Sequence, residues 1–380
     1  MQTAARHAAV PVPGFTDHHA HLLRAAAGVT FPATPQEVAE FHRTVAAQGR
    51  SPMDVLDAEP GRVGPSLAER LAAALSRAAA AGLVEVTEMG VRSWRHLDAL
   101  NELQRAGPLP CRVRVYLASG LADEAGRAEL EARRSDSGPW LRVDGVKFYA
   151  DGWLVPRTCA VCRDFADTGG NGVLFSDATG LARRILPLAE RGWRIATHAI
   201  GDRGVQTVLD AYDLAFDSDP AAIAAAAPRI EHASLLSGDL IARMAAAGVT
   251  ACIQPSFAVT DAGQLAPALG ADRAAHAYPW RALAAAGVTM LAGSDYPIEV
   301  LEPLPGLARL ILGRSDRPGF QTSQSAPAQA RLPAALAFGL MTQPAAGQTL
   351  LSADPRSVPA GQLDQVQVLG TRPAPFPAAA

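Results

Sequence analysis

Residues 143–152 read VDGVKFYADG, and this stretch holds Lys147, the only lysine in a chain of 380 residues. Lysine and arginine together number 34, so arginine supplies nearly all of the permanent positive charge. The stretch is apolar and strand-like, and burying an unpaired ammonium group there would be costly. Unlike a guanidinium, a buried lysine can lose its proton and form a Schiff base or take up carbon dioxide as a carbamate. Two interpretations follow: a lysine kept for chemistry, or a surface lysine at a strand end.

The stretch is the fourth of eight β-rich runs that alternate with helical segments rich in alanine, leucine and arginine. Several runs follow a glycine, as in AAGLVEV and ERGWRIA, which is typical of a glycine that ends a helix. Eight such units predict an α/β fold, a closed (β/α)8 TIM-type barrel, rather than an open sheet. The expected strands are residues 12–15, 83–89, 112–119, 144–151, 194–200, 229–234, 250–256 and 289–295. The expected helices between them are residues 66–80, 93–105, 123–134, 179–191, 204–216, 237–247 and 278–286.

The barrel is expected to occupy residues 12–346, after an N-terminal segment of residues 1–11. Residues 347–380 are expected to form one strand, at 362–369, and a flexible tail. Two long connections break the regular spacing and are expected to border the barrel mouth, at residues 22–65 and 155–177.

Composition indicates a soluble globular protein that acts on a small molecule. Its 49% hydrophobic and 19% charged residues allow a large core. A net charge of −3 gives no basic surface for nucleic acid. We see no segment suited to a signal peptide or a membrane span, and four cysteines are too few for a disulfide framework, so we expect a cytoplasmic protein. We expect no nucleic-acid or membrane partner, and a homodimer is the assembly to be tested.

Two histidines at the end of the first run have the spacing of metal ligands. His19 and His21, in GFTDHHAH, are two residues apart, so on an extended chain both rings point to the same side and can clamp one metal ion. Asp17 precedes them on that face and is a candidate to orient one of the rings.

Single polar residues end four other runs: Lys147, His198, His232 and Asp295. Each alone is more typical of a structural residue than of a ligand. Together with the histidine pair they fall at the C-terminal ends of strands, where a barrel of this type gathers its catalytic groups. Six such placements favour one shared site.

These motifs resemble those of a known group of enzymes. GFTDHHAH, DGVKFYADGWL, THAIGD, RIEHA and GSDYP, in this order, are similar to the markers of the amidohydrolase superfamily, in its family-3 branch with the N-substituted formamide deformylases. The segment LPAALAFGLMTQPA resembles the closing segment of that branch. The resemblance covers most of residues 12–346.

The resemblance implies a binuclear metal centre, whose ligands are His19, His21, Lys147, His198, His232 and Asp295. It implies that the histidines of the first strand share one metal ion with Asp295, that the other two bind the second ion, and that carboxylated Lys147 bridges them. Asp295 is also implied as the base. Imidazoles with one carboxylate suit zinc, and iron or manganese are alternatives.

The chemistry of such a site is hydrolysis of an amide-type C–N bond in an N-acyl or N-formyl amine or a cyclic amide. Paired metal ions would acidify a water to hydroxide and polarise the substrate carbonyl, and a lysine carbamate would supply the anionic bridge from a neutral amine and carbon dioxide. Asp295 can accept the proton of the attacking water and return it to the leaving amine.

Several other residues are candidates to bind substrate. Arg157 is a carboxylate clamp or one half of a structural ion pair, and Glu88 either reaches the pocket or pairs with an arginine, of which we favour pairing. Gln254 is a candidate hydrogen-bond donor. Trp153 and Tyr296 flank the motifs and either line the pocket or pack in the core.

The sequence departs from the family pattern at its ends. Relatives carry several N-terminal strands that complete a small β-sandwich, whereas here about a dozen residues precede the first expected strand. We therefore expect that sandwich to be vestigial or absent.

Other functions remain to be compared with the hydrolase. A mononuclear deaminase would need a carboxylic acid three residues after His198, and Gly201 stands there. A non-hydrolytic cyclase or lyase could use the same metal ions. A catalytically silent binding module is the third alternative, but such proteins usually lose ligands.

Overall fold

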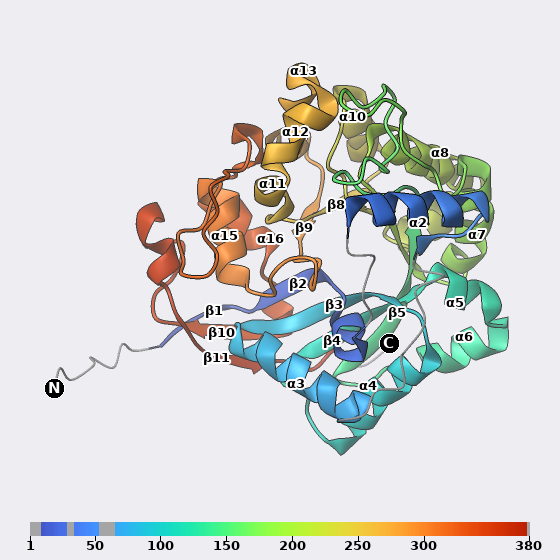
Figure 1. Ribbon diagram of the computed structural model, residues 1–380. Coiled ribbons are helices and arrows are strands. Elements are labelled where there is room, and N and C mark those ends of the chain that lie inside the picture. Colours follow the sequence, from blue (N-terminus) through green and yellow to red (C-terminus); the bar gives the residue numbers. More distant parts are fainter. Residues whose placement is uncertain (1–8, 29–33, 53–64, 378–380) are drawn as a thin grey trace.

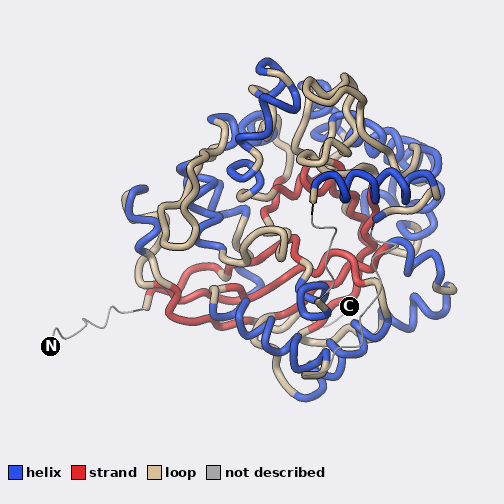
Figure 2. Tube along the Cα trace, viewed as in Figure 1, coloured by secondary structure: helices blue, strands red, loops and turns tan. Residues whose placement is uncertain are grey.

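The computed structural model of the protein describes residues 9–28, 34–52 and 65–377 (Figure 1). Its centre is an eight-stranded sheet in which each strand pairs with the next one in the chain, always in parallel. Figure 2 shows these strands as a ring with helices around the outside. The fold is the expected (β/α)8 barrel. Its strands are β2 (Phe15–Ala20), β3 (Leu83–Val91), β4 (Arg112–Ala118), β5 (Leu141–Tyr149), β6 (Arg194–Ala199), β7 (Arg229–His232), β8 (Thr250–Ile253) and β9 (Met290–Ala292).

The ring closes between β2 and the segment that follows β9. Ala20 and Tyr296 form a parallel bridge, and the Asp295 N–H donates to the carbonyl oxygen of His19 over 2.7 Å. The His21 N–H donates to the carbonyl oxygen of Tyr296, also over 2.7 Å. The barrel is therefore closed by the backbone of four predicted site residues, His19, His21, Asp295 and Tyr296.

The interior of the barrel explains the glycine of the VDGVK segment. Gly145 in β5 pairs with Tyr116 in β4, and a Cβ atom on Gly145 would lie 2.2 Å from the tyrosine ring. Tyr116 packs with Met89 and Ala196 inside the ring. A glycine is needed at 145 because the tyrosine occupies the space that a side chain would take.

The helices pack around the ring as the alternating pattern predicts. They are α1 (Leu22–Ala27), α2 (Pro35–Ala47), α3 (Leu67–Ala80), α4 (Trp94–Ala106), α5 (Ser119–Glu124), α6 (Arg127–Arg134), α7 (Ala178–Ala189), α8 (Asp202–Ser218), α9 (Pro220–Ala225), α10 (Gly238–Ala246), α11 (Phe257–Thr260), α12 (Ala262–Leu269), α13 (Ala271–Ala274), α14 (Trp280–Ala285), α15 (Pro303–Leu312) and α16 (Ala334–Leu340). Capping boxes at Ser66 and Thr34 start α3 and α2. Each hydroxyl accepts the backbone N–H of a glutamate three residues on, and the carboxylate of that glutamate accepts the backbone N–H of the capping residue. None of the helices in the described ranges is long and apolar enough to cross a membrane.

Segments near the two ends of the chain form a small second sheet of three strands, in keeping with a vestigial sandwich, but the sequence pattern misplaced its strands. It is antiparallel, with the order β1 (Val10–Pro13), β10 (Gly347–Leu351) and β11 (Val368–Pro373). The first expected strand, 12–15, was therefore wrong in place: the apolar VPVP pairs with β10, and the barrel strand begins at Phe15. The first half of the expected strand 362–369 lies in a 3-10 helix, Ala360–Gln365, and the strand β11 begins only at Val368.

Residues 374–377 are packed against the barrel where a flexible tail was expected, and residues 378–380 of that tail lie outside the described residues. Phe376 is 6% exposed, and the guanidinium groups of Arg112, Arg114 and Arg142 lie 4.3 to 5.3 Å from the centre of its ring. The Phe376 N–H donates to the carbonyl oxygen of Pro139 over 2.8 Å. The contacts of three guanidinium groups with the Phe376 ring stabilise this segment and offset the conformational entropy that it loses on ordering.

Helix α2 lies over the loop that follows β5 (Figure 1). Its His42 is buried, and Nδ1 of that ring lies 2.8 Å from the hydroxyl of Thr158. The ring also makes edge contacts with Trp153 and Phe175. Parts of both long connections are therefore docked on each other near the barrel mouth, while residues 29–33 and 53–64 of the first lie outside the described residues.

Candidate metal centre

The six predicted ligands are all buried at the C-terminal ends of barrel strands. Five of them line a cavity of about 330 Å³, namely His19, His21, His198, His232 and Asp295. Lys147, in β5, lies in the sheet between Ala118 of β4 and Ala196 of β6, its partners in register. The structure thus gathers residues that are up to 276 positions apart, as between His19 and Asp295, at one end of the barrel.

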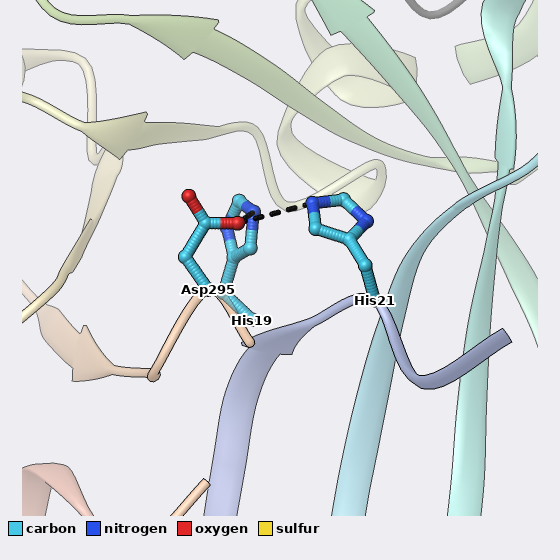
Figure 3. A group of neighbouring side chains, drawn as sticks. All are labelled: His19, His21 and Asp295. Carbon is cyan, nitrogen blue, oxygen red and sulfur yellow. Dashed lines mark ion pairs between the residues drawn. The ribbon is translucent and has the colours of Figure 1, made fainter. Parts of the chain in front are cut away.

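His19, His21 and Asp295 form one compact group of potential ligands (Figure 3). Oδ1 of Asp295 lies 3.1 Å from Nε2 of His21 and 3.4 Å from Nε2 of His19. Burial alone would raise the pKa of the Asp295 carboxyl, but the two imidazoles outweigh it and hold that pKa well below its ordinary value. The carboxylate is therefore ionised and placed beside two nitrogen donors.

Three of the imidazoles are each held through one ring nitrogen. Nδ1 of His19 lies 2.6 Å from Glu231 Oε2, and Nδ1 of His232 lies 2.7 Å from Gln254 Oε1. Nε2 of His198 lies 3.0 Å from the carbonyl oxygen of Gly152. In each ring the other nitrogen is available as a ligand, which is how metal-binding histidines are usually oriented.

Three of the histidines, His21, His198 and His232, are kept neutral by burial. Burial lowers the pKa of His21 and of His232 to about 3, and it lowers that of His198 well below its ordinary value. The rings of His198 and His232 are 4.4 Å apart between centres, and that of His232 is 5.1 Å from His19. Neutral imidazoles at this spacing are the form in which histidine binds a metal ion.

Lys147 has no exposed surface, and its Nζ has no hydrogen-bond partner among the described residues. Nζ lies 4.7 Å from the centre of the Tyr149 ring, which in turn stacks on His198. Burial lowers the pKa of the lysine to about 8. An amine in this environment can reach its neutral form near physiological pH.

Of the predicted substrate-binding residues, one lines the cavity and the others hold the structure around it. Trp153 lines the cavity. Arg157 does not, because it is ion-paired with Asp167, with Nη2 and Oδ2 at 2.6 Å. Gln254 orients His232, and Tyr296 contributes its backbone to barrel closure.

Glu88 and Asp17 support the backbone of the site. Oε2 of Glu88 accepts the N–H of Leu23 over 3.0 Å, so this carboxylate holds the start of α1 and does not line the cavity. Asp17 was expected to orient a histidine ring. It accepts instead the backbone N–H groups of His19 and Ser294, over 3.0 and 2.9 Å, because the carboxylate lies where β2 meets the segment after β9.

Sequence reasoning missed three residues of the site. Glu231 holds His19, and its signal was the alternation in RIEH, which places Arg229 and Glu231 on one face of β7. Asp151 accepts three backbone N–H groups from the loop after β5 and the end of β6. Arg24, on α1, lines the cavity, and nothing local distinguishes it from the other arginines.

Comparison with known proteins places this geometry in a family. YtcJ of Bacillus subtilis (strain 168), whose name classes it with the amidohydrolases, is 30% identical over 258 residues, which are 62% of this chain and 47% of YtcJ. The protein LONG AFTER FAR-RED 3 of Arabidopsis thaliana is 30% identical over 173 residues, which are 43% of this chain and 28% of that protein. The chain thus spans less than half the length of these curated relatives.

Two solved structures share the fold. An uncharacterized metal-dependent hydrolase from Pyrococcus horikoshii OT3 superposes with a TM-score of 0.69 at 19% identity, over 93% of this chain and 88% of that chain. Another from Pyrococcus furiosus gives a TM-score of 0.66 at 22% identity, over 96% and 85%. A model of the amidohydrolase family matches residues 37–353, which is most of the sequence. The chain therefore belongs to the amidohydrolase family.

Proposed function

We propose that the protein is a metal-dependent hydrolase that cleaves an amide-type C–N bond other than a peptide bond, in an N-acyl or N-formyl amine or a cyclic amide. Within the family, the motifs around Lys147 favour the branch similar to N-substituted formamide deformylases. The observation that carries the proposal is the placement of this lysine. It is the only lysine of the chain, it is fully buried, and four histidines and an aspartate surround the same end of the barrel.

The donor atoms fit two divalent metal ions. Nε2 of His19 and Nζ of Lys147 are buried without a hydrogen-bond partner among the described residues, as expected of atoms intended for another group. The group of His19, His21 and Asp295 would hold one ion, and His198 with His232 the other. This nitrogen-rich set suits zinc best, with iron or manganese as alternatives.

Lys147 is suited to supply the bridge between the two sites. Its neutral amine can form an N–C bond with carbon dioxide and release a proton, which leaves a carbamate with two oxygen donors. Burial favours this step because it disfavours the ammonium form. The alanines that flank Lys147 in the neighbouring strands keep bulk away from the new group.

Bound divalent ions would lower the pKa of a water and polarise the substrate carbonyl. Asp295 supports the reaction as general base and then general acid. Its carboxylate accepts a proton as water attacks the carbonyl carbon, and it returns that proton to the nitrogen as the C–N bond breaks. Apolar side chains of the cavity wall, such as Trp153, Leu154 and Phe257, would bind the rest of the substrate and limit the entry of water.

The geometry argues against a mononuclear deaminase. That reaction needs a carboxylic acid at the position of Gly201, where a Cβ atom would lie 1.9 Å from the carbonyl oxygen of Ala160. No side chain fits there without moving the loop after β5. The deaminase would also leave Lys147 without a role.

The proposal is tested by a hydrolysis screen. The full chain, loaded with zinc, iron or manganese, is offered N-formyl amines, N-acetyl amines and cyclic amides, and release of the amine or opening of the ring is measured. We expect turnover of at least one class by the wild type and a loss of about 10²-fold or more in kcat for Asp295→Asn. Turnover that is unaffected by Asp295→Asn, or none in any class, would overturn the proposal.

A further inference from the structure

One wall of the cavity is a short turn after β5, residues 153–158, which we call the wall turn. Four consecutive residues of it line the cavity: Trp153, Leu154, Val155 and Pro156. Helix α2 lies over this loop, and its buried His42 contacts the turn (Figure 1). We propose that His42 is a positioning residue of the cavity, which holds the wall turn in place while its ring is neutral and releases it when the ring is protonated. The inference rests on the proposed function, since it concerns how the same cavity takes its substrate.

The wall turn is closed at its base by Thr158. The hydroxyl oxygen of Thr158 accepts the N–H of Trp153 over 2.9 Å, and the Thr158 N–H donates to the carbonyl oxygen of Trp153, also over 2.9 Å. Within the turn, the Arg157 N–H donates to the carbonyl oxygen of Leu154 over 2.9 Å. These bonds join the two ends of the turn, so the position of its lining residues depends on where Thr158 is held.

Helix α2 holds Thr158 through His42. Nδ1 of His42 lies 2.8 Å from the Thr158 hydroxyl, and its ring makes edge contacts with Trp153 and Phe175, at 4.9 and 5.7 Å between ring centres. A Cβ atom on Gly152 would lie 2.3 Å from that hydroxyl oxygen and 2.7 Å from Nδ1 of His42. A glycine is therefore needed at 152, because the histidine and the threonine meet in the space that a side chain would take.

The surroundings of His42 suit the neutral ring. Its side chain has no exposed surface, and Nε2 has no hydrogen-bond partner among the described residues. Burial lowers the pKa of His42 to about 4, from an ordinary value of 6.5. A protonated ring would carry an N–H at both nitrogens, so the N–H at Nε2 would be buried without an acceptor and the charge without a counterion.

No charged group of the described residues contributes to this lowered pKa, which has burial as its cause. The loop after β5 presents uncharged groups to the ring, and the titratable member of the adjoining apolar cluster of Val45 and Phe175 is Tyr149. The charged side chains of α2 and of this loop are exposed or have other partners, as do Glu37, Glu40, Arg43, Asp151, Arg157 and Asp167. Protonation of His42 therefore gains no compensating ion pair.

Opening of the wall turn is thus coupled to the pH. When the turn opens, the His42 ring meets water and can bind a proton below a pH of about 6.5, whereas in the closed turn it stays neutral down to a pH of about 4. Above pH 6.5 both forms carry a neutral ring and the pH has no effect. Below it, the equilibrium shifts toward the open turn by about tenfold for each pH unit, down to a pH of about 4. The cavity therefore loses the hold on one wall as the solution becomes acidic.

The test measures this opening by hydrogen exchange on the full chain, metal-loaded and after chelation, between pH 8 and pH 5. The protection factor of the peptide that covers residues 153–158 compares its exchange with that of an unfolded peptide at the same pH, so the pH dependence of the exchange chemistry cancels. His42→Asn can keep a hydrogen bond to Thr158 but does not titrate, and Thr158→Val removes the hydroxyl. His96→Asn is the matched control, since His96 is a buried histidine of α4 that does not line the cavity. Unfolding curves show whether each variant is folded.

We expect the protection factor of the wild type to fall about tenfold or more from pH 7 to pH 5, with and without metal. His96→Asn should show the same fall. His42→Asn should show a protection factor that does not change with pH, and Thr158→Val a low one at every pH. Constant protection in the wild type, or a fall that persists in His42→Asn, overturns the inference.

Hydrolysis of N-formylphenethylamine at pH 7, followed in parallel, separates the inference from the proposed function. Thr158→Val should raise the KM about fivefold or more and change kcat by less than about twofold, because the wall binds substrate and takes no part in the chemical step. A lowered kcat with the KM of the wild type overturns the role of the wall turn in substrate binding. If the exchange results are as expected but the wild type cleaves no amide, the role of His42 stands and the proposed hydrolase function fails.

Discussion

Nδ1 of His19 lies 2.6 Å from Oε2 of Glu231, and both side chains are buried. Burial alone would raise the pKa of Glu231, but Arg229 and His19 outweigh it and hold that pKa well below its ordinary value. An ionised carboxylate at this distance holds the His19 ring through Nδ1 and leaves Nε2 on the side of Asp295, 3.4 Å from Oδ1. A carboxylate buried inside the barrel, that of Glu231, thus orients the imidazole of His19 at the barrel mouth.

Replacing Glu231 should therefore weaken metal binding. We expect Glu231→Gln to lower the affinity for zinc about 10- to 100-fold, because the amide keeps the shape but loses the charge that orients His19. The affinity is measured by competition with a chromophoric chelator. Glu85→Gln is the matched control, since Glu85 is a buried carboxylate that pairs with Arg112 in the same barrel, with Oε2 and Nε at 2.5 Å. It should reduce stability and leave the zinc affinity unchanged; equal losses in both variants would contradict this role of Glu231.

The packed end of the chain should contribute to stability. Phe376→Ala removes a buried ring that three arginines stack on, and we expect the free energy of unfolding to fall by about 2–4 kcal/mol. Urea unfolding of both proteins measures the difference. Leu369→Ala, at an exposed position of β11, should change it by less than about 0.5 kcal/mol. Similar small effects for both substitutions would show that the tail is dispensable.

The stability of the fold should also depend on the pH through Asp261. Burial raises the pKa of this carboxyl to about 6, against an ordinary value of 3.8. Between these values the folded protein binds the proton and the unfolded chain does not, so the contribution of Asp261 to stability is present at low pH and falls as the pH rises from about 4 to 6. Asp261→Asn should flatten this decline by at most about 1.4 kcal/mol per pH unit. The free energy of unfolding at several pH values measures it, and an unchanged slope in the variant would refute the assignment.

Most of the barrel could be predicted because parallel strands are buried on both faces and therefore read as apolar runs. Residues 83–89, for example, fall within β3, all of whose side chains are buried. The first strand was misplaced for a physical reason: β2 reads FTDHHA, and its polar site residues hide the strand pattern, while the apolar VPVP before it pairs with β10. The apolar pattern expected of a buried strand is absent from β2 because several of its residues belong to the candidate site.

The candidate ligands could be predicted because each stands at the end of a run, and a barrel brings all such ends together. The residues around them could not. The sequence singled out Arg157 and not Arg24, and only the fold shows that Arg24 lines the cavity while Arg157 is ion-paired with Asp167. The small sheet of the chain ends depends on pairing between segments more than 330 residues apart, such as Val10 with Leu351, which no local pattern reveals.

The central claim is that Lys147 joins two metal ions, and metal content per chain together with intact mass in the presence of carbon dioxide tests it most directly. The comparison covers the wild type, Lys147→Ala and Lys147→Arg. We predict two metal ions and the added mass of one carbon dioxide in the wild type, loss of the paired ions in both variants, and partial rescue of Lys147→Ala by short carboxylic acids. A single tightly held ion, bound equally well with and without Lys147, would contradict the account.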